Sequence, residues 1–215
     1  MPFYIVMILI SFLASVIGLL ADRNRVSILI AFSFFLLLSA FIEIIGWRMS
    51  SKYYNTIALY NFFTLFEFIF YLFFFRAVLT GGRIRKTILV VLVIYTAAAL
   101  TDIFFIQKGA FHTYTYVLGC IIMVIFSIAY FYFLFRFPEK GSLARNPYFW
   151  IGIALMFYYT CTFSLYGLEN FITEKMRYYN RLLFLVSDLL NISLYTLFSI
   201  GFLCKINIRK LSASS

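Results

Sequence analysis

Four of the eight acidic residues stand inside long apolar stretches, namely Glu43, Glu67, Asp102 and Asp188. No lysine or arginine occurs at a comparable depth in those stretches, so we expect none of the four acids to have a basic partner at its own depth in the membrane. An ionised carboxylate at the centre of a membrane helix costs about 2.5–3.5 kcal/mol. Each carboxyl group is therefore expected to be protonated, hydrogen-bonded, hydrated in a cavity or bound to a cation.

Two of these acids belong to sets of polar residues that recur every three or four positions, as neighbours on one side of a helix do. One set is Asn61, Thr64, Glu67 and Tyr71, and the other is Asp188, Asn191, Tyr195 and Ser199. Lipid offers such residues no partner, so both sets should face the interior of a helix bundle. Hydrogen bonding between tightly packed helices would explain them equally well.

The sharper hypothesis is a polar cavity that opens to the outer side and has Glu67 at its floor. Its predicted ligand-binding residues are Glu67, Asp188, Asn191, Asn61, Tyr71 and Tyr195, with Asp102 and Glu43 nearby. Carboxyl and amide groups without a base favour an amine, a cation or a shared proton, and they disfavour an anion. We expect no cofactor and no metal.

Motifs of common enzymes are missing from the sequence. The stretch from Thr80 to Thr87 ends like a phosphate-binding loop, but Arg85 occupies the position of the second glycine. His112 is the single histidine, which excludes the usual zinc and serine-histidine hydrolase sites. It falls in the short segment 107–113 and is predicted to be solvated. Enzymatic activity is therefore the least favoured function.

The composition indicates that these residues lie on membrane-spanning helices. Of 215 residues, 64% are apolar and 12% charged, whereas soluble domains average about 25% charged. About 20 apolar residues cross a bilayer as a helix, and seven stretches are long enough. They are Phe3–Leu20, Val26–Gly46, Thr56–Leu79, Thr87–Ile106, Tyr114–Phe137, Tyr148–Leu168 and Arg181–Cys204. None contains proline, so we predict seven continuous helices in an all-α polytopic bundle.

The distribution of basic residues predicts the orientation. Twelve of the 18 lysines and arginines fall on the side of the C-terminus, and six fall on the other side. The richer side should be cytoplasmic, so the N-terminus is predicted to lie outside and the C-terminus inside an inner membrane. Residues 1–205 would form one transmembrane domain, and residues 206–215 a short cytoplasmic tail rich in serine. The net charge of +10 then reflects this bias and gives no reason to expect nucleic-acid binding.

Three features are shared with a known group of proteins. They are Glu67 in its phenylalanine-rich helix, the run from Asn146 to Ile151, and Asn191-x-x-x-Tyr195 followed by the run from Gly201 to Cys204. Over roughly residues 55–205 the chain resembles a family of small, uncharacterised seven-helix bacterial inner-membrane proteins. This resemblance implies the seven-helix fold and no activity, so it assigns a role to no residue.

Three classes of function stay open at this stage. A receptor or sensor would bind a small ligand in the outer cavity and signal to a cytoplasmic protein at the basic loops. A transporter or channel would use the carboxyl groups for protons or cations, although the broken helices typical of transporters are missing. A membrane accessory or effector protein, for example in phage defence, would act by assembly, with acids that are purely structural.

Overall fold

The computed structural model describes residues 2–21, 27–137, 142–169 and 177–204, and the side chains of residues 167–182 lie outside this description. The described residues form seven long helices and no strand. The helices are α1 (Phe3–Ala21), α2 (Ser27–Ser51), α3 (Ile57–Val78), α4 (Gly82–Thr101), α5 (Thr113–Arg136), α6 (Pro147–Glu169) and α7 (Arg177–Leu203). All seven are long and apolar enough to cross a membrane. The predicted all-α fold is confirmed at this level.

Several helices extend beyond the apolar stretches that predicted them. α2 continues from Gly46 to Ser51, α4 begins at Gly82 rather than Thr87, and α7 begins at Arg177 rather than Arg181. The added turns carry lysine or arginine, which are good helix formers. A search for apolar runs does not detect such turns, although they continue the same helix.

The fourth span is one continuous helix from Gly82 to Ile106, as predicted, but its last turn differs from the rest. α4 gives way at Asp102 to a π-helical turn, η1 (Asp102–Ile106). The amide of Gln107 there donates to the carbonyl of Asp102, five residues back, over 2.8 Å. Such turns are rare and occur frequently at functional sites, and this one carries one of the four intramembrane acids.

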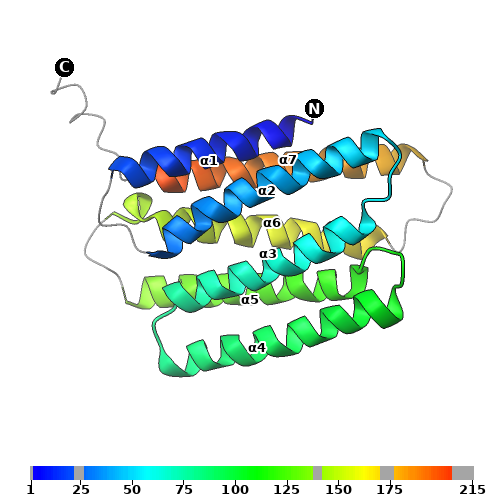
Figure 1. Cartoon of the computed structure of the whole chain (residues 1–215). Helices are drawn as coiled ribbons and strands as arrows, with labels where there is room; N and C mark the ends of the chain where they lie inside the picture. The colour runs from blue at the N-terminus through cyan, green and yellow to red at the C-terminus, as the bar shows by residue number, and fades with distance from the viewer. Residues whose placement is uncertain (1, 22–26, 138–141, 170–176, 205–215) are drawn as a thin grey trace, which may run out of the picture.

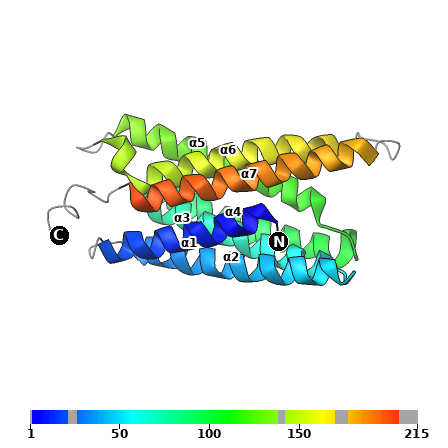
Figure 2. The same ribbon diagram turned by 90° about the horizontal axis from the view of Figure 1, so that it is seen from above.

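The helices lie side by side and alternate in direction (Figures 1 and 2). We call the end where α1 begins the N-terminal end of the bundle, and the end where α7 finishes the C-terminal end. α7 packs between α1 and α6, α5 packs on α6 and α3, and α4 packs on α3 and α5. α4 lies at the edge of the bundle (Figure 1).

Aromatic side chains fill the centre between these helices. Phe32 of α2 meets Phe198 and Phe202 of α7 with ring centroids 4.9 and 5.9 Å apart. Phe68 of α3 contacts Tyr95, Tyr116 and Tyr159, which belong to α4, α5 and α6. The ring contacts between α2 and α7 and between α3 and α6 thus connect helices whose backbones make few close contacts. A short 3₁₀ helix, η2 (Leu143–Arg145), precedes α6.

Candidate functional site

Glu43 is held by two tyrosines from neighbouring helices. Its Oε2 accepts hydrogen bonds from the hydroxyl of Tyr4 on α1, over 3.0 Å, and from the hydroxyl of Tyr60 on α3, over 3.1 Å. One turn further along α2, Gly46 leaves the space that the Tyr60 hydroxyl occupies, because a β-carbon there would collide with it. The carboxyl group therefore joins three helices, and it has no basic partner among the described residues. Sequence reasoning missed both tyrosines, since nothing in the spacing relates α1 or the start of α3 to Glu43.

Asp188 of α7 lies near this group. Its carboxyl interacts electrostatically with Glu43 and with the Tyr4 hydroxyl, and its side chain is partly exposed. In the described part of the chain it makes no ion pair or hydrogen bond. Asn191, predicted to point into the same cavity, instead donates its amide to the carbonyl of Ser187 in its own helix, over 3.0 Å.

Glu67 occupies the interior of the bundle. Its carboxyl interacts electrostatically with Glu43 and with Tyr71, one turn away in the same helix. Side chains of three further helices surround it at electrostatic range, namely Tyr116 and Cys120 of α5, Tyr158 and Tyr159 of α6, and Tyr195 of α7. The lipid-facing side of α3 carries Phe62, Phe66 and Phe73, which are 50%, 43% and 44% exposed. Glu67 thus points away from lipid.

The three acids form a series across the bundle, which we call the carboxylate chain: Asp188, Glu43 and Glu67. Each retains some accessible surface, although Glu67 is enclosed by other helices. The nearby Tyr159 hydroxyl is buried and bonds no protein atom among the described residues. A buried hydroxyl without a partner costs about 1–3 kcal/mol, so it favours a bound water molecule or ligand. The arrangement suits a small, hydrogen-bonding species of positive charge.

Towards the C-terminal end, phenylalanines close the space below Glu67. Phe32, Phe74, Phe198 and Phe202 are all completely buried, and the ring of Phe32 contacts each of the other three at 4.9–5.9 Å between centroids. We call these four residues the aromatic block. A charged ligand next to Glu67 would find no polar group in the block to replace its hydration, so entry from the N-terminal end is favoured.

Asn61 does not belong to the predicted cavity, which corrects that part of the hypothesis. Its side-chain Nδ2 donates to the carbonyl of Ala110 over 3.0 Å. Its Oδ1 accepts from the backbone amide of His112 over 3.3 Å and lies 2.9 Å from the ring Nδ1 of the same residue. Asn61 therefore fixes the connection between α4 and α5 onto the first turn of α3.

Asp102 also lies apart from the carboxylate chain. It is 1% exposed, and its Oδ2 accepts hydrogen bonds from the backbone amide and the hydroxyl of Thr115, over 3.1 and 2.9 Å. Thr115 stands in the first turn of α5, where exposed amides and the helix dipole favour a negative charge. Asp102 thus caps a neighbouring helix through its Oδ2, whereas its buried Oδ1 bonds no atom of the described residues.

His112 is buried, and the prediction of a solvated side chain is wrong. It is 0% exposed, and its Nε2 lies 3.2 Å from the hydroxyl of Thr64. Burial lowers the pKa of the imidazole from 6.5 to about 4, although the nearby Asp102 opposes this shift. The ring is therefore neutral at pH 7, so its Nδ1 donates to Asn61 and its Nε2 accepts from Thr64.

This burial predicts a dependence of stability on pH. Between pH 6.5 and about 4 the unfolded chain takes up a proton at His112 that the folded protein does not, so stability falls as the pH falls through this range. At about 1.4 kcal/mol per pKa unit, the loss is at most about 3 kcal/mol. The free energy of unfolding in detergent should differ more between the wild type and His112→Gln at pH 7 than at pH 4. A difference that stays constant over this range would contradict the assignment.

The chain matches no protein family model, no curated protein and no solved structure. The resemblance to small bacterial seven-helix proteins therefore stays a prediction. Interpretation of the site rests on its geometry.

Proposed function

We propose that this chain is a receptor-like membrane protein that binds a small cation at the carboxylate chain. The observation that supports this best is that Asp188, Glu43 and Glu67, from three helices, lie in series without a basic partner among the described residues. A bound cation would relieve the cost of these buried carboxylates. An anion would add to that cost.

The ligand reaches the site from the N-terminal end, which the distribution of lysine and arginine predicts to be the outer side of an inner membrane. Asp188 is the entry residue and Glu67 is the deepest one in this proposal. In this proposal Tyr71 and Tyr195 also belong to the site, because both interact electrostatically with Glu67. The proposal assigns structural roles to Asn61, Asn191 and Asp102.

Signalling is favoured over transport by the aromatic block. A transporter must pass its substrate beyond Glu67, but the completely buried rings of Phe32, Phe198 and Phe202 lie on that side and offer a charged substrate no polar group. In a receptor the bound cation would alter the packing of α2, α3 and α7, and the basic loops at the C-terminal end would present that change to a cytoplasmic protein.

Exchange of salts at constant ionic strength tests the proposal. We expect the unfolding temperature of the purified full-length chain to change when tetramethylammonium chloride replaces sodium chloride, since the site distinguishes cations. Replacing chloride by acetate should leave it unchanged. An unfolding temperature that depends on the anion but not on the cation would contradict the proposal. In proteoliposomes, proton flux driven by a gradient of either cation would instead favour the coupled transporter.

A further inference from the structure

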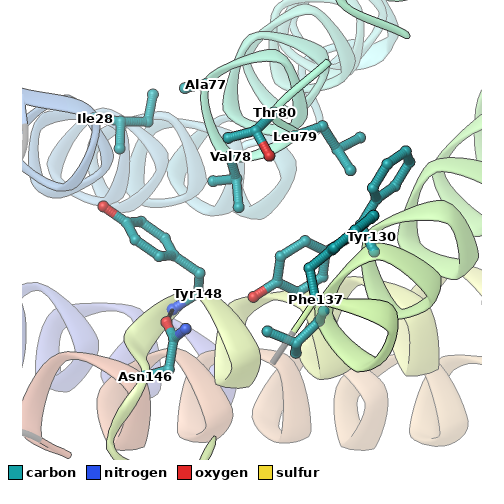
Figure 3. A pocket seen from close by; sticks show the side chains of 11 residues that line it. Ile28, Ala77, Val78, Leu79, Thr80, Tyr130, Phe137, Asn146 and Tyr148 are labelled. Carbon is teal, nitrogen blue, oxygen red and sulfur yellow. Dashed lines mark hydrogen bonds between the residues drawn. The ribbon is translucent and has the colours of Figure 1, made fainter. Parts of the chain in front are cut away.

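A second cavity lies at the C-terminal end, remote from the carboxylate chain. It measures about 300 Å³ and is lined by residues of α2, α3, α5 and α6 and by Thr80, which follows α3. Figure 3 shows Val78 and Thr80 above it, Tyr148 and Asn146 below, and Phe137 at one side. Nothing in the proposed receptor function uses this space.

Its lining is amphipathic. Val78, Phe137 and Ile28 supply apolar walls, whereas Thr80, Asn146 and Tyr148 bring polar groups. The Oδ1 of Asn146 accepts from the backbone amide of Tyr148 over 2.9 Å, so its amide NH₂ is directed to other acceptors. Hydrogen-bond donors beside apolar walls suit a ligand with a polar oxygen-rich head and a hydrocarbon body.

Basic residues lie at the same end of the bundle as the cavity. The guanidinium of Arg136 donates to the hydroxyl of Tyr132, one turn earlier in α5, and lies over the ring of Phe137, 5.7 Å from its centroid. Phe137 is part of the cavity wall. Arg83, Arg85, Lys86 and Arg145 are exposed at the same end, and the described part of that end contains no acidic residue. A negatively charged head group is therefore favoured.

The cavity also lies at the ends of helices that are long and apolar enough to cross a membrane, where lipid head groups would meet the protein. It borders the last turns of α3 and α5 and the first turn of α6. The indole of Trp150 donates to the carbonyl of Ala144 over 2.9 Å beside it, and tryptophan is enriched at the membrane surface. An acyl chain could therefore leave the cavity directly into the bilayer.

We propose that this cavity binds an anionic phospholipid, with the phosphate between Arg136 and Asn146 and the upper hydrocarbon against Val78 and Phe137. The basic end of the protein then has a specific lipid site as well as a general attraction to anionic membranes. A phospholipid bound in this cavity would bridge α3, α5 and α6 at the end of the bundle opposite the carboxylate chain.

Native mass spectrometry of the full-length chain, extracted from nanodiscs of phosphatidylcholine with added phosphatidylglycerol, tests this site. We expect one phosphatidylglycerol to be retained, and Arg136→Gln to weaken retention about tenfold, as for the loss of one charge-assisted hydrogen bond. Val78→Phe, which fills the cavity, should also abolish retention. Arg85→Gln is the matched control, because it removes an exposed arginine of the same end that does not border the cavity.

Two results would overturn the proposal. Equal retention by wild type, Arg136→Gln and Arg85→Gln would show that only the overall charge attracts lipid. Displacement of the lipid by inorganic phosphate at equal concentration would assign the site to free phosphate. If Val78→Phe fails to fold, Arg136→Gln decides alone, because its exposed side chain is not required for packing.

Discussion

Replacing Gly119 by valine should destabilise the bundle by about 3 kcal/mol, the upper part of the range for overpacked cores. A β-carbon at Gly119 of α5 would lie 2.7–2.9 Å from three ring carbons of Phe68. Phe68 is 0% exposed, and the rings of Tyr95, Tyr116 and Tyr159 surround it at 5.3–5.6 Å between centroids. The ring therefore has no free space into which to move.

Unfolding in mixed detergent micelles measures this effect, with Gly82→Val as the control. Gly82 also lies in a helix, but a β-carbon there would meet nothing within 4 Å, so its replacement should cost less than about 1 kcal/mol. Combining Gly119→Val with Phe68→Leu should recover part of the stability, because the two residues are in contact. Equal stability of the two glycine variants would show that Phe68 does not pack against α5 in this way.

Glu67→Gln should abolish the dependence of the unfolding temperature on the cation, while the protein still folds. The amide keeps the shape of the side chain, but it carries no charge. We expect cation affinity to fall at least about tenfold, equivalent to about 1.4 kcal/mol. Stability without ligand should stay the same or rise, because an uncompensated buried charge is removed.

Asp102→Asn is the matched control for this variant. It also neutralises an intramembrane acid, but Asp102 caps α5 through Thr115 and its amide oxygen can still accept those bonds. Cation dependence should therefore persist. Loss of the dependence in Asp102→Asn and its retention in Glu67→Gln would move the site from the carboxylate chain to the connection between α4 and α5.

The position of each acid along its helix follows from the sequence, whereas its direction and partners do not. A helix rises about 1.5 Å per residue, which places Glu67 near the middle of α3. The direction in which a side chain points depends on its angle around the helix axis, and the predicted direction of Asn61 shows how such a prediction fails. It precedes Glu67 by two steps of three residues, and two such steps rotate a helix face by about 120° in total. Asn61 therefore faces the connection between α4 and α5 instead of the cavity.

Partners from distant segments were also invisible in the sequence. Tyr4 precedes Glu43 by 39 residues, and Asn61 precedes His112 by 51, so no local periodicity relates them. His112 was expected to be solvated because short polar connections usually are, but Asn61 and Thr64 bury its ring. A glycine one turn from an intramembrane acid, such as Gly46 beside Glu43, was the only local signal of an approaching side chain.

In the proposed function, the cation reaches Glu67 from the N-terminal end of the bundle, which faces the outer side of the membrane. A Glu67→Cys variant tests it directly, in a background where Cys120, Cys161 and Cys204 are replaced by serine. Vesicles of known orientation would be treated with a membrane-impermeant cationic thiol reagent. We predict labelling from the outer side alone. Labelling from the cytoplasmic side alone, or none from either side when the denatured protein reacts fully, would contradict it.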